Sequence, residues 1–317
     1  MKTIRNSSHI DLKLLSESGQ IFRLEEVSEY HFILPYKKSI LHFFQKESDI
    51  EWESFGEEIL EKEIEELLRI NMDRQFFEEV CDADPFAKYA LEQSPGMWLV
   101  KQDPWECLLG FILSQNKFLE QIKICVKRVA MTFGQKITTP YGDFWTTPTS
   151  DEILNNDPKR LQNLGLGYRA PYIQCAAEYV KNNEQAWKDI GNQPTLNIRE
   201  FLMKIKGVGP KVADCVLLFG FARDEVIPFD VWLLRIMHEL YGYPENAPYH
   251  HYVAWQGERF PEMAGWIQQV LFYHARKVAK RGVPLSETWF KEIEKTIAPN
   301  SPVRIIEPAF EHNSLPR

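Results

Sequence analysis

Cysteine is scarce in this 317-residue chain, and the few cysteines present are not spaced for cross-linking. Their number, five, is odd, and no two of them have the C-x-x-C spacing that is typical of zinc sites and redox pairs. A closed disulfide framework is therefore disfavoured. The sequence favours reduced thiols in an intracellular protein. The five residues are Cys81, Cys107, Cys125, Cys175 and Cys215.

The chain also lacks long apolar runs and an excess of positive charge. No run is long enough to span a membrane, and the N-terminus has no apolar core of a signal peptide, so we expect no membrane association. The net charge of −8 argues against indiscriminate binding to polyanions. Nucleic-acid contacts would need local basic patches, although each patch can equally be an ordinary solvated helix face. The candidates are Lys123, Lys127 and Arg128, and Arg276, Lys277, Lys280 and Arg281.

Hydrophobic residues make up 44% of the sequence and include nine tryptophans, which is enough for a large core divided between two or more lobes. We expect residues 1–94 to form an α+β domain. Apolar residues from Leu12 to Leu34 alternate with polar ones, as in short antiparallel strands, and an acidic amphipathic helix follows. Residues 95–298 have helical periodicity throughout, and residues 299–317 are expected to be a C-terminal tail.

Residues 201–219 predict a helix, a tight hairpin and a second helix. Two glycines in Gly207–Gly209 suit a turn that something outside approaches closely. The free N–H groups at the start of the second helix favour an anion, most simply a phosphate oxygen. Lys211 lies in the first turn of that helix, where the helix dipole disfavours a cation. Asp230 precedes a new apolar run and is predicted to be the N-cap of a further helix.

Each of these features has an ordinary explanation by itself: a plain helix connection, a solvated Lys211 and a simple cap at Asp230. Their combination, VGPKVADC followed by VIPFDVW, resembles the helix-hairpin-helix, glycine-proline-Asp superfamily of DNA base-excision glycosylases, and is most similar to the 8-oxoguanine DNA glycosylases. The resemblance implies a mainly α fold, with a helix-hairpin-helix core in two helical lobes and an N-terminal antiparallel sheet. It also implies that Gly207, Val208 and Gly209 contact DNA.

The resemblance assigns the chemistry to Lys211 and Asp230. Cleavage of an N-glycosidic bond puts positive charge on the sugar, so a neutral lysine amine can attack C1′ and form a Schiff base, after which β-elimination cuts the strand. A nearby carboxylate stabilises the sugar cation and can orient or deprotonate the amine. We therefore expect the helix N-terminus and partial burial to lower the pKa of Lys211.

A pocket for the damaged base follows from the same resemblance. In the segment SGQIFR, Gly19 matches a glycine whose carbonyl accepts a hydrogen bond from the N7 proton that 8-oxoguanine has and guanine lacks. Gln268 and Phe272 share a helix face, where an amide suits the Watson–Crick edge of a purine and a phenyl ring suits its flat face. Cys215 is placed on the opposite face of the base. The alternatives are core packing for Phe272 and Cys215 and a plain turn for Gly19.

Two further segments resemble loops that the family inserts into the duplex. In SQNK, Asn116 matches the residue that enters the space left by the extruded base. Gln121 stands where the eukaryotic branch has an arginine that reads the opposite cytosine, so we expect a looser preference for cytosine. In LGLGYRA, Tyr168 matches an aromatic wedge and Arg169 a residue near the DNA backbone. The ordinary explanations are a helix junction and a capping glycine.

The sequence predicts no required cofactor and no metal site, although the hairpin carbonyls can hold a monovalent cation that bridges to phosphate. No cysteine follows Cys215, which excludes the iron–sulfur branch of the superfamily. The predicted partner is double-stranded DNA that contains oxidised guanine, bound by a monomer. Trp232, where the eukaryotic branch has histidine, favours a bacterial or archaeal relative. A glycosylase for another damaged purine and a non-catalytic helix-hairpin-helix module stay open as alternatives.

Overall fold

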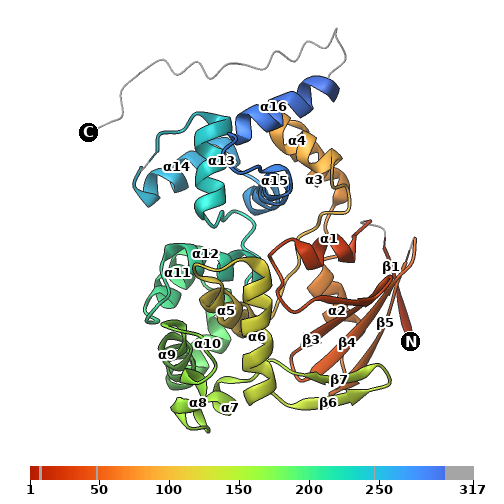
Figure 1. The fold of residues 1–317 in the computed structure, drawn as a ribbon, viewed down its shortest axis with the longest axis vertical. Coiled ribbons are helices and arrows are strands. Elements are labelled where there is room, and N and C mark those ends of the chain that lie inside the picture. The colour runs from red at the N-terminus through yellow and green to blue at the C-terminus, as the bar shows by residue number, and fades with distance from the viewer. Residues whose placement is uncertain (7–8, 48, 246, 297–317) are drawn as a thin grey trace.

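The computed structural model describes residues 1–6, 9–47, 49–245 and 247–296. Figure 1 shows three packed parts: an N-terminal sheet, a helical lobe beside it that contains α5 to α12, and a second helical lobe above both. The predicted C-terminal tail, residues 299–317, lies outside the described residues. Within the part of the chain that the structure describes, no helix combines the length and apolarity needed to cross a membrane.

The N-terminal sheet is five-stranded and antiparallel, in the order β1-β5-β4-β3-β2. A row of aromatic side chains crosses it, because Phe32 pairs with Phe43 and Phe43 pairs with Trp52, and all three are buried. Cross-strand aromatic neighbours of this kind stabilise sheet register. The strands are β1 (Lys2–Arg5), β2 (Glu25–Ser28), β3 (His31–Tyr36), β4 (Ser39–Gln45) and β5 (Asp49–Gly56).

The predicted antiparallel sheet is thus confirmed, but the segment that begins at Leu12 is not a strand. It is the helix α1 (Leu12–Glu17), because the Asp11 side chain accepts hydrogen bonds from the backbone N–H groups of Lys13 and Leu14 and so caps the helix. The acidic helix is confirmed as α2 (Glu61–Leu68), which buries its apolar face.

The lobe beside the sheet is built around α5 (Pro104–Ser114), whose residues from Cys107 to Leu113 are all buried. The expectation of unbroken helix after residue 95 is wrong at the hairpin of β6 and β7. Its turn places the Tyr141 ring on His31 and His42 of the N-terminal sheet, with ring centres 4.7 and 4.6 Å apart. The elements are α6 (Leu119–Phe133), β6 (Lys136–Thr139), β7 (Gly142–Trp145), α7 (Ser150–Leu154), α8 (Pro158–Gln162), α9 (Arg169–Asn182), α10 (Glu184–Asp189), η1 (Ile190–Asn192), α11 (Thr195–Met203) and α12 (Pro210–Phe219).

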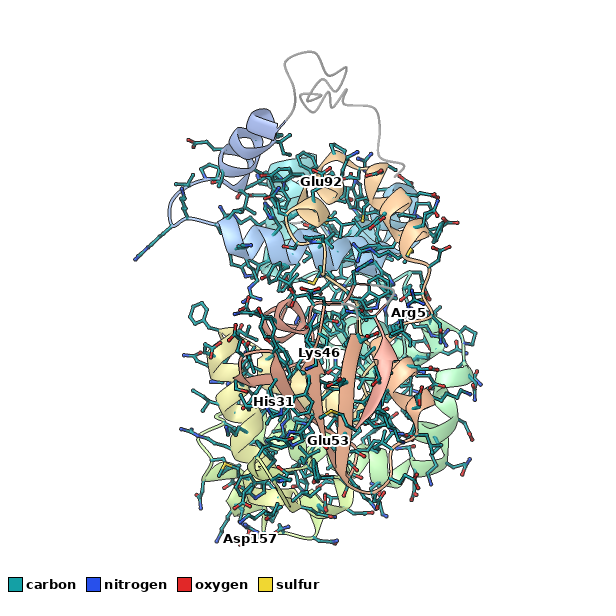
Figure 2. The ribbon with its side chains drawn as sticks, turned by 90° about the vertical axis from the view of Figure 1, so that its right-hand side faces the viewer. Arg5, His31, Lys46, Glu53, Glu92 and Asp157 are labelled. Atoms are coloured by element: carbon teal, nitrogen blue, oxygen red, sulfur yellow. The ribbon has the colours of Figure 1, made fainter. Side chains whose placement is uncertain are left out.

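The upper lobe surrounds α15 and takes two of its helices from the N-terminal part of the chain (Figure 1). Trp98 and Phe77 pack on Trp266 of α15 with ring centres 4.7 and 5.2 Å apart. The predicted domain boundary at residue 94 therefore separates helices that pack together. In the view of Figure 2, Glu92 lies in this lobe, above His31 and Glu53 in the sheet. The helices are α3 (Arg74–Asp82), α4 (Pro85–Glu92), α13 (Val231–Tyr241), α14 (Tyr249–Arg259), α15 (Ala264–Val278) and α16 (Leu285–Thr296).

Candidate active site

The predicted hairpin joins α11 to α12, and its two glycines have different reasons to be glycine. Gly207 has a φ of +92°, and a Cβ there would lie 2.3 Å from the ring of Tyr172. Its carbonyl accepts a 3.0 Å hydrogen bond from Nε2 of Gln115. Gly209 is the N-cap of α12, is exposed, and has no atom within 4 Å of a Cβ built on it. The protein itself therefore requires a glycine at 207, whereas position 209 is open to an approaching molecule.

Lys211 and Asp230 come together where the two helical lobes meet. Figure 1 shows α12, which carries Lys211 in its first turn, lying below α13, which Asp230 precedes. Asp230 is the N-cap of α13, as predicted, and accepts hydrogen bonds from the backbone N–H groups of Trp232 and Leu233 at 2.9 and 3.0 Å. The Lys211 ammonium lies 5.1 Å from the centre of the Phe111 ring, a cation–π contact.

The electrostatics of Lys211 combine burial with two acidic groups. Burial is the largest influence and lowers the pKa of the ammonium, whereas negative charges on Cys215 and Asp230 act the other way and together raise that pKa above its usual value. Burial also raises the pKa of the Cys215 thiol to about 12, so this thiol is neutral near pH 7. Asp230 is then the charge that stabilises the ammonium at that pH. Near pH 7 burial therefore acts to lower the lysine pKa, as expected, and the charge of Asp230 acts against it.

Gly19 and Phe272, far apart in the sequence, are neighbours in the structure. Gly19 follows α1 with a φ of +78°, and a Cβ there would lie 3.5 Å from Cε1 of Phe272 and 3.1 Å from Nη1 of Arg276. The amide of Gln269 donates a 3.2 Å hydrogen bond to the carbonyl of Ser18 and so fastens this turn to α15. The fold thus brings the predicted glycine to the predicted aromatic ring, with an arginine beside both.

Gln268 is only 4% exposed, yet its Oε1 has no hydrogen-bond partner among the residues that the structure describes. An unpaired buried polar group of this kind costs about 1–3 kcal/mol, so it marks a site where a ligand can provide the missing partner. Cys215 is also buried, lies one helical turn after Lys211, and shares a hydrogen bond with its side chain. The thiol of Cys107 donates to the Cys215 carbonyl at 3.7 Å and packs against the same turn.

The predicted wedge residues also meet. Asn116, in the left-handed region with a φ of +50°, is exposed between α5 and α6 and donates to the hydroxyl of Tyr168 at 3.0 Å. Gln121 is exposed, and its Oε1 accepts a 3.4 Å hydrogen bond from the N–H of Phe118 in a capping box at the start of α6. Its side-chain oxygen is therefore engaged within the protein, and no described residue accepts a hydrogen bond from its amide N–H groups.

Arg169 is buried, whereas the sequence predicted an arginine near the DNA backbone. Only 6% of it is exposed, and its guanidinium donates to the carbonyl oxygens of Gln115 and Leu166 and lies 4.4 Å from the Tyr168 ring centre. Without DNA it therefore braces the loops that carry Asn116 and Tyr168, and its donors are not presented to a phosphate.

Two further residues, one beside these loops and one beside Gly19, were not singled out as site residues from the sequence. Phe118 is 82% exposed at the N-cap of α6, a position where Ser, Thr, Asp or Asn is usual. Arg276 appeared only as one member of a basic patch. A signal was present for both: an aromatic ring at a capping position, and an arginine four residues after Phe272, on the same helix face.

Two family models match the sequence. The model of the HhH-GPD superfamily of base excision DNA repair proteins matches residues 109–256. The model of the N-terminal domain of 8-oxoguanine DNA glycosylases matches residues 2–108. The hairpin, the lysine at the start of its second helix and the capping aspartate thus lie on a fold of the base-excision repair class.

Relatives and a solved structure narrow this class. The chain is 30% identical over 238 residues to a probable N-glycosylase/DNA lyase of Methanothermobacter thermautotrophicus, covering 69% of this chain and 75% of that one. It is 30% identical over 270 residues to the N-glycosylase/DNA lyase of Saccharomyces cerevisiae, covering 76% and 71%. The Clostridium acetobutylicum 8-oxoguanine glycosylase/lyase, in complex with double-stranded DNA containing cytosine opposite to 8-oxoG, matches with a TM-score of 0.80 and 26% identity over 87% of this chain and 94% of that one. The chain belongs to the N-glycosylase/DNA lyase family of the HhH-GPD superfamily.

Proposed function

We propose that this chain is a bifunctional enzyme that excises 8-oxoguanine from duplex DNA and then cuts the strand as a lyase. The observation that carries the proposal is the electrostatic coupling of Asp230 both to Lys211 and to Arg276, which lies against Gly19 and Phe272. An amine and a carboxylate at the junction of two lobes, next to a ring and a free buried amide, match what excision of a purine requires.

The reaction uses Lys211 as the nucleophile. Its Nζ bonds to C1′ of the flipped nucleotide while the N9–C1′ bond breaks and its electron pair leaves with the base, which takes up a proton. In the resulting N,O-acetal the C1′–O4′ bond breaks, O4′ takes up a proton, and Nζ becomes the nitrogen of a Schiff base. Loss of a C2′ proton then breaks the C3′–O bond and expels the 3′ phosphate. Asp230 stabilises positive charge on the sugar and can accept a proton from the ammonium.

The pocket residues recognise the extruded purine. The amide of Gln268 lacks a partner for its oxygen and pairs with the Watson–Crick edge of the base. Phe272 stacks on one face, Cys215 covers the other, and the Gly19 carbonyl accepts the N7 proton of 8-oxoguanine. Extrusion costs a few kcal/mol, which Asn116 and Tyr168 offset by filling the gap in the duplex.

The proposal also covers DNA-backbone binding, oligomeric state and cellular location. Gly207, Val208 and Gly209 bind a backbone phosphate through the start of α12, and a monovalent cation held by hairpin carbonyls strengthens that contact. The enzyme acts as a monomer. It works inside the cell where the DNA is, in the cytoplasm or nucleoid of a bacterium or archaeon.

Borohydride trapping tests the chemistry directly. The wild type is expected to form a covalent adduct with a duplex that contains 8-oxoguanine, and Lys211→Gln is expected to form none because the amine is gone. Lys206→Gln is the matched control, since Lys206 is exposed on the same hairpin and should keep the adduct.

The outcomes separate the alternatives. Unchanged DNA binding without any adduct in the wild type would identify a non-catalytic module. An adduct that forms equally well with other damaged purines but not with 8-oxoguanine would assign a different lesion. An adduct that persists in Lys211→Gln would move the nucleophile to another residue.

A further inference from the structure

Arg276 belongs to the face of α15 that carries Gln268 and Phe272, because the three residues are spaced four apart. Its guanidinium lies 5.2 Å from the centre of the Phe272 ring, and its Nη1 would lie 3.1 Å from a Cβ on Gly19. The charge of Asp230 is close enough to act on Arg276, although the two do not form an ion pair. Arg276 therefore lies beside the pocket turn and within electrostatic reach of the predicted catalytic carboxylate.

Apart from its contact with the Phe272 ring, the guanidinium has no hydrogen-bond acceptor among the described residues. No hydrogen bond or ion pair within that part of the chain uses its side chain, whereas the neighbouring Gln269 and Tyr273 are fastened to Ser18 and Glu17. Burial lowers its pKa from the usual value, and Asp230 acts against that lowering. Partial burial of a guanidinium without an acceptor is unfavourable, so its position favours an acceptor that a ligand brings.

The order of atoms in a purine indicates which acceptor that is. C8 lies between N7 and N9, and N9 carries C1′ of the sugar. A base whose N7 faces Gly19 and whose C1′ faces Lys211 and Asp230 must direct C8 into the space between them. Arg276 lies beside Gly19 and within electrostatic reach of Asp230, that is, next to this space.

We infer that Arg276 is a specificity-determining residue that donates hydrogen bonds to the O8 oxygen of flipped 8-oxoguanine, an inference that rests on the proposed function. Guanine has hydrogen at C8 and offers no acceptor there, so the contact would favour the oxidised base. When the N9–C1′ bond breaks, the electron pair that leaves with the base places negative charge partly on O8, and a cation beside it stabilises that charge.

The rival partner for the same guanidinium is a backbone phosphate, and binding measurements distinguish the two. We would measure Kd in a Lys211→Gln background, where the base stays in place, for duplexes carrying 8-oxoguanine, guanine or a tetrahydrofuran abasic site. Arg276→Met is expected to weaken binding of the 8-oxoguanine duplex about 10-fold or more and to leave the other two within about twofold. Arg276→Lys, which keeps the charge without the fork of donors, should fall between.

Lys277→Met is the matched control, because Lys277 is the next residue of α15, carries the same charge and is exposed. It should change all three affinities by one common factor. A uniform loss in Arg276→Met, with a smaller salt dependence, would assign the residue to a phosphate and overturn the inference. Unchanged affinities would overturn it too, provided that thermal melting shows both Arg276 variants folded.

Failure of the proposed function gives a different result. In that case the Lys211→Gln parent would itself bind 8-oxoguanine and guanine duplexes equally, and the wild type would not excise 8-oxoguanine. The inference about Arg276 is overturned when the parent discriminates and the Arg276→Met variant discriminates equally well.

Discussion

Asn116 donates a 3.0 Å hydrogen bond from Nδ2 to the hydroxyl of Tyr168, and this bond joins two loops that both face the predicted duplex side of the site. Arg169 braces the same loops through the carbonyl of Gln115. The two predicted wedge residues are thus held together in the absence of DNA, and this order lowers the entropy cost of the insertion proposed for them.

Tyr168→Phe should weaken lesion binding with little effect on folding. The change removes the hydroxyl that orders Asn116, and one hydrogen bond is worth about 0.5–1.5 kcal/mol, so single-turnover excision at subsaturating enzyme should slow about 2- to 10-fold. Tyr141→Phe is the control, since its hydroxyl donates a hydrogen bond to half-buried Glu53 on the sheet, away from these loops. Equal effects of both changes would refute the role of the Tyr168 hydroxyl.

The two hairpin glycines should respond differently to alanine. Gly207→Ala combines a left-handed φ with a Cβ 2.3 Å from the Tyr172 ring and should lower the free energy of unfolding by about 2 kcal/mol or more. Gly209→Ala meets no neighbour and should cost less than about 1 kcal/mol. Urea unfolding measures both, and a similar loss for the two variants would contradict the hairpin geometry.

Methionine substitutions at the two adjacent glutamines of α15, Gln268 and Gln269, should change the free energy of unfolding in opposite directions. Gln268→Met removes a buried oxygen without a partner and should raise the free energy of unfolding by up to about 1 kcal/mol while slowing excision at least about 10-fold. Gln269→Met removes the hydrogen bond to Ser18 and should lower stability by about 1 kcal/mol. A stabilised Gln268→Met with full activity would show that this amide does not contact the base.

The rate of Schiff-base formation should rise with pH. Only the neutral amine reacts, and the charge of Asp230 favours the ammonium, so the neutral fraction grows as pH increases through 7–9. Trapping on a pre-formed abasic site, at subsaturating protein, measures this step without base excision.

Asp230→Asn should move that pH profile to lower values, because the charge that raises the lysine pKa is removed. Asparagine still caps α13, so the fold should remain intact. A pH profile that stays in place after this substitution would show that Asp230 does not control the protonation of Lys211.

Local signals in the sequence were sufficient for much of the site. Asp230 caps α13 as predicted, since capping depends on a side chain and the N–H groups two or three residues later. The hairpin and the position of Lys211 in the first turn of α12 follow from glycines and apolar spacing over a few residues. The acidic helix α2 was found in the same way.

Other features depended on segments that meet only after folding. The hairpin of β6 and β7 interrupts a helical pattern, and the ring of Tyr141 in its turn packs on the rings of His31 and His42, which lie on a sheet distant in sequence. Arg169 is buried because carbonyls from another loop accept its hydrogen bonds. Neither partner is detectable from periodicity, which reports only neighbours along one element.

The sequence by itself determined which residues supply an amine, a carboxylate, an amide and a ring, and that helices present them. Tertiary structure decided the protonation of the Lys211 amine and which residues contact the Phe272 ring. The charge on Lys211 depends on the distance to Asp230, and the place of Arg276 depends on how α15 meets the turn at Gly19. Electrostatic energy varies with separation and burial in space, and sequence spacing encodes neither once the residues lie on different elements.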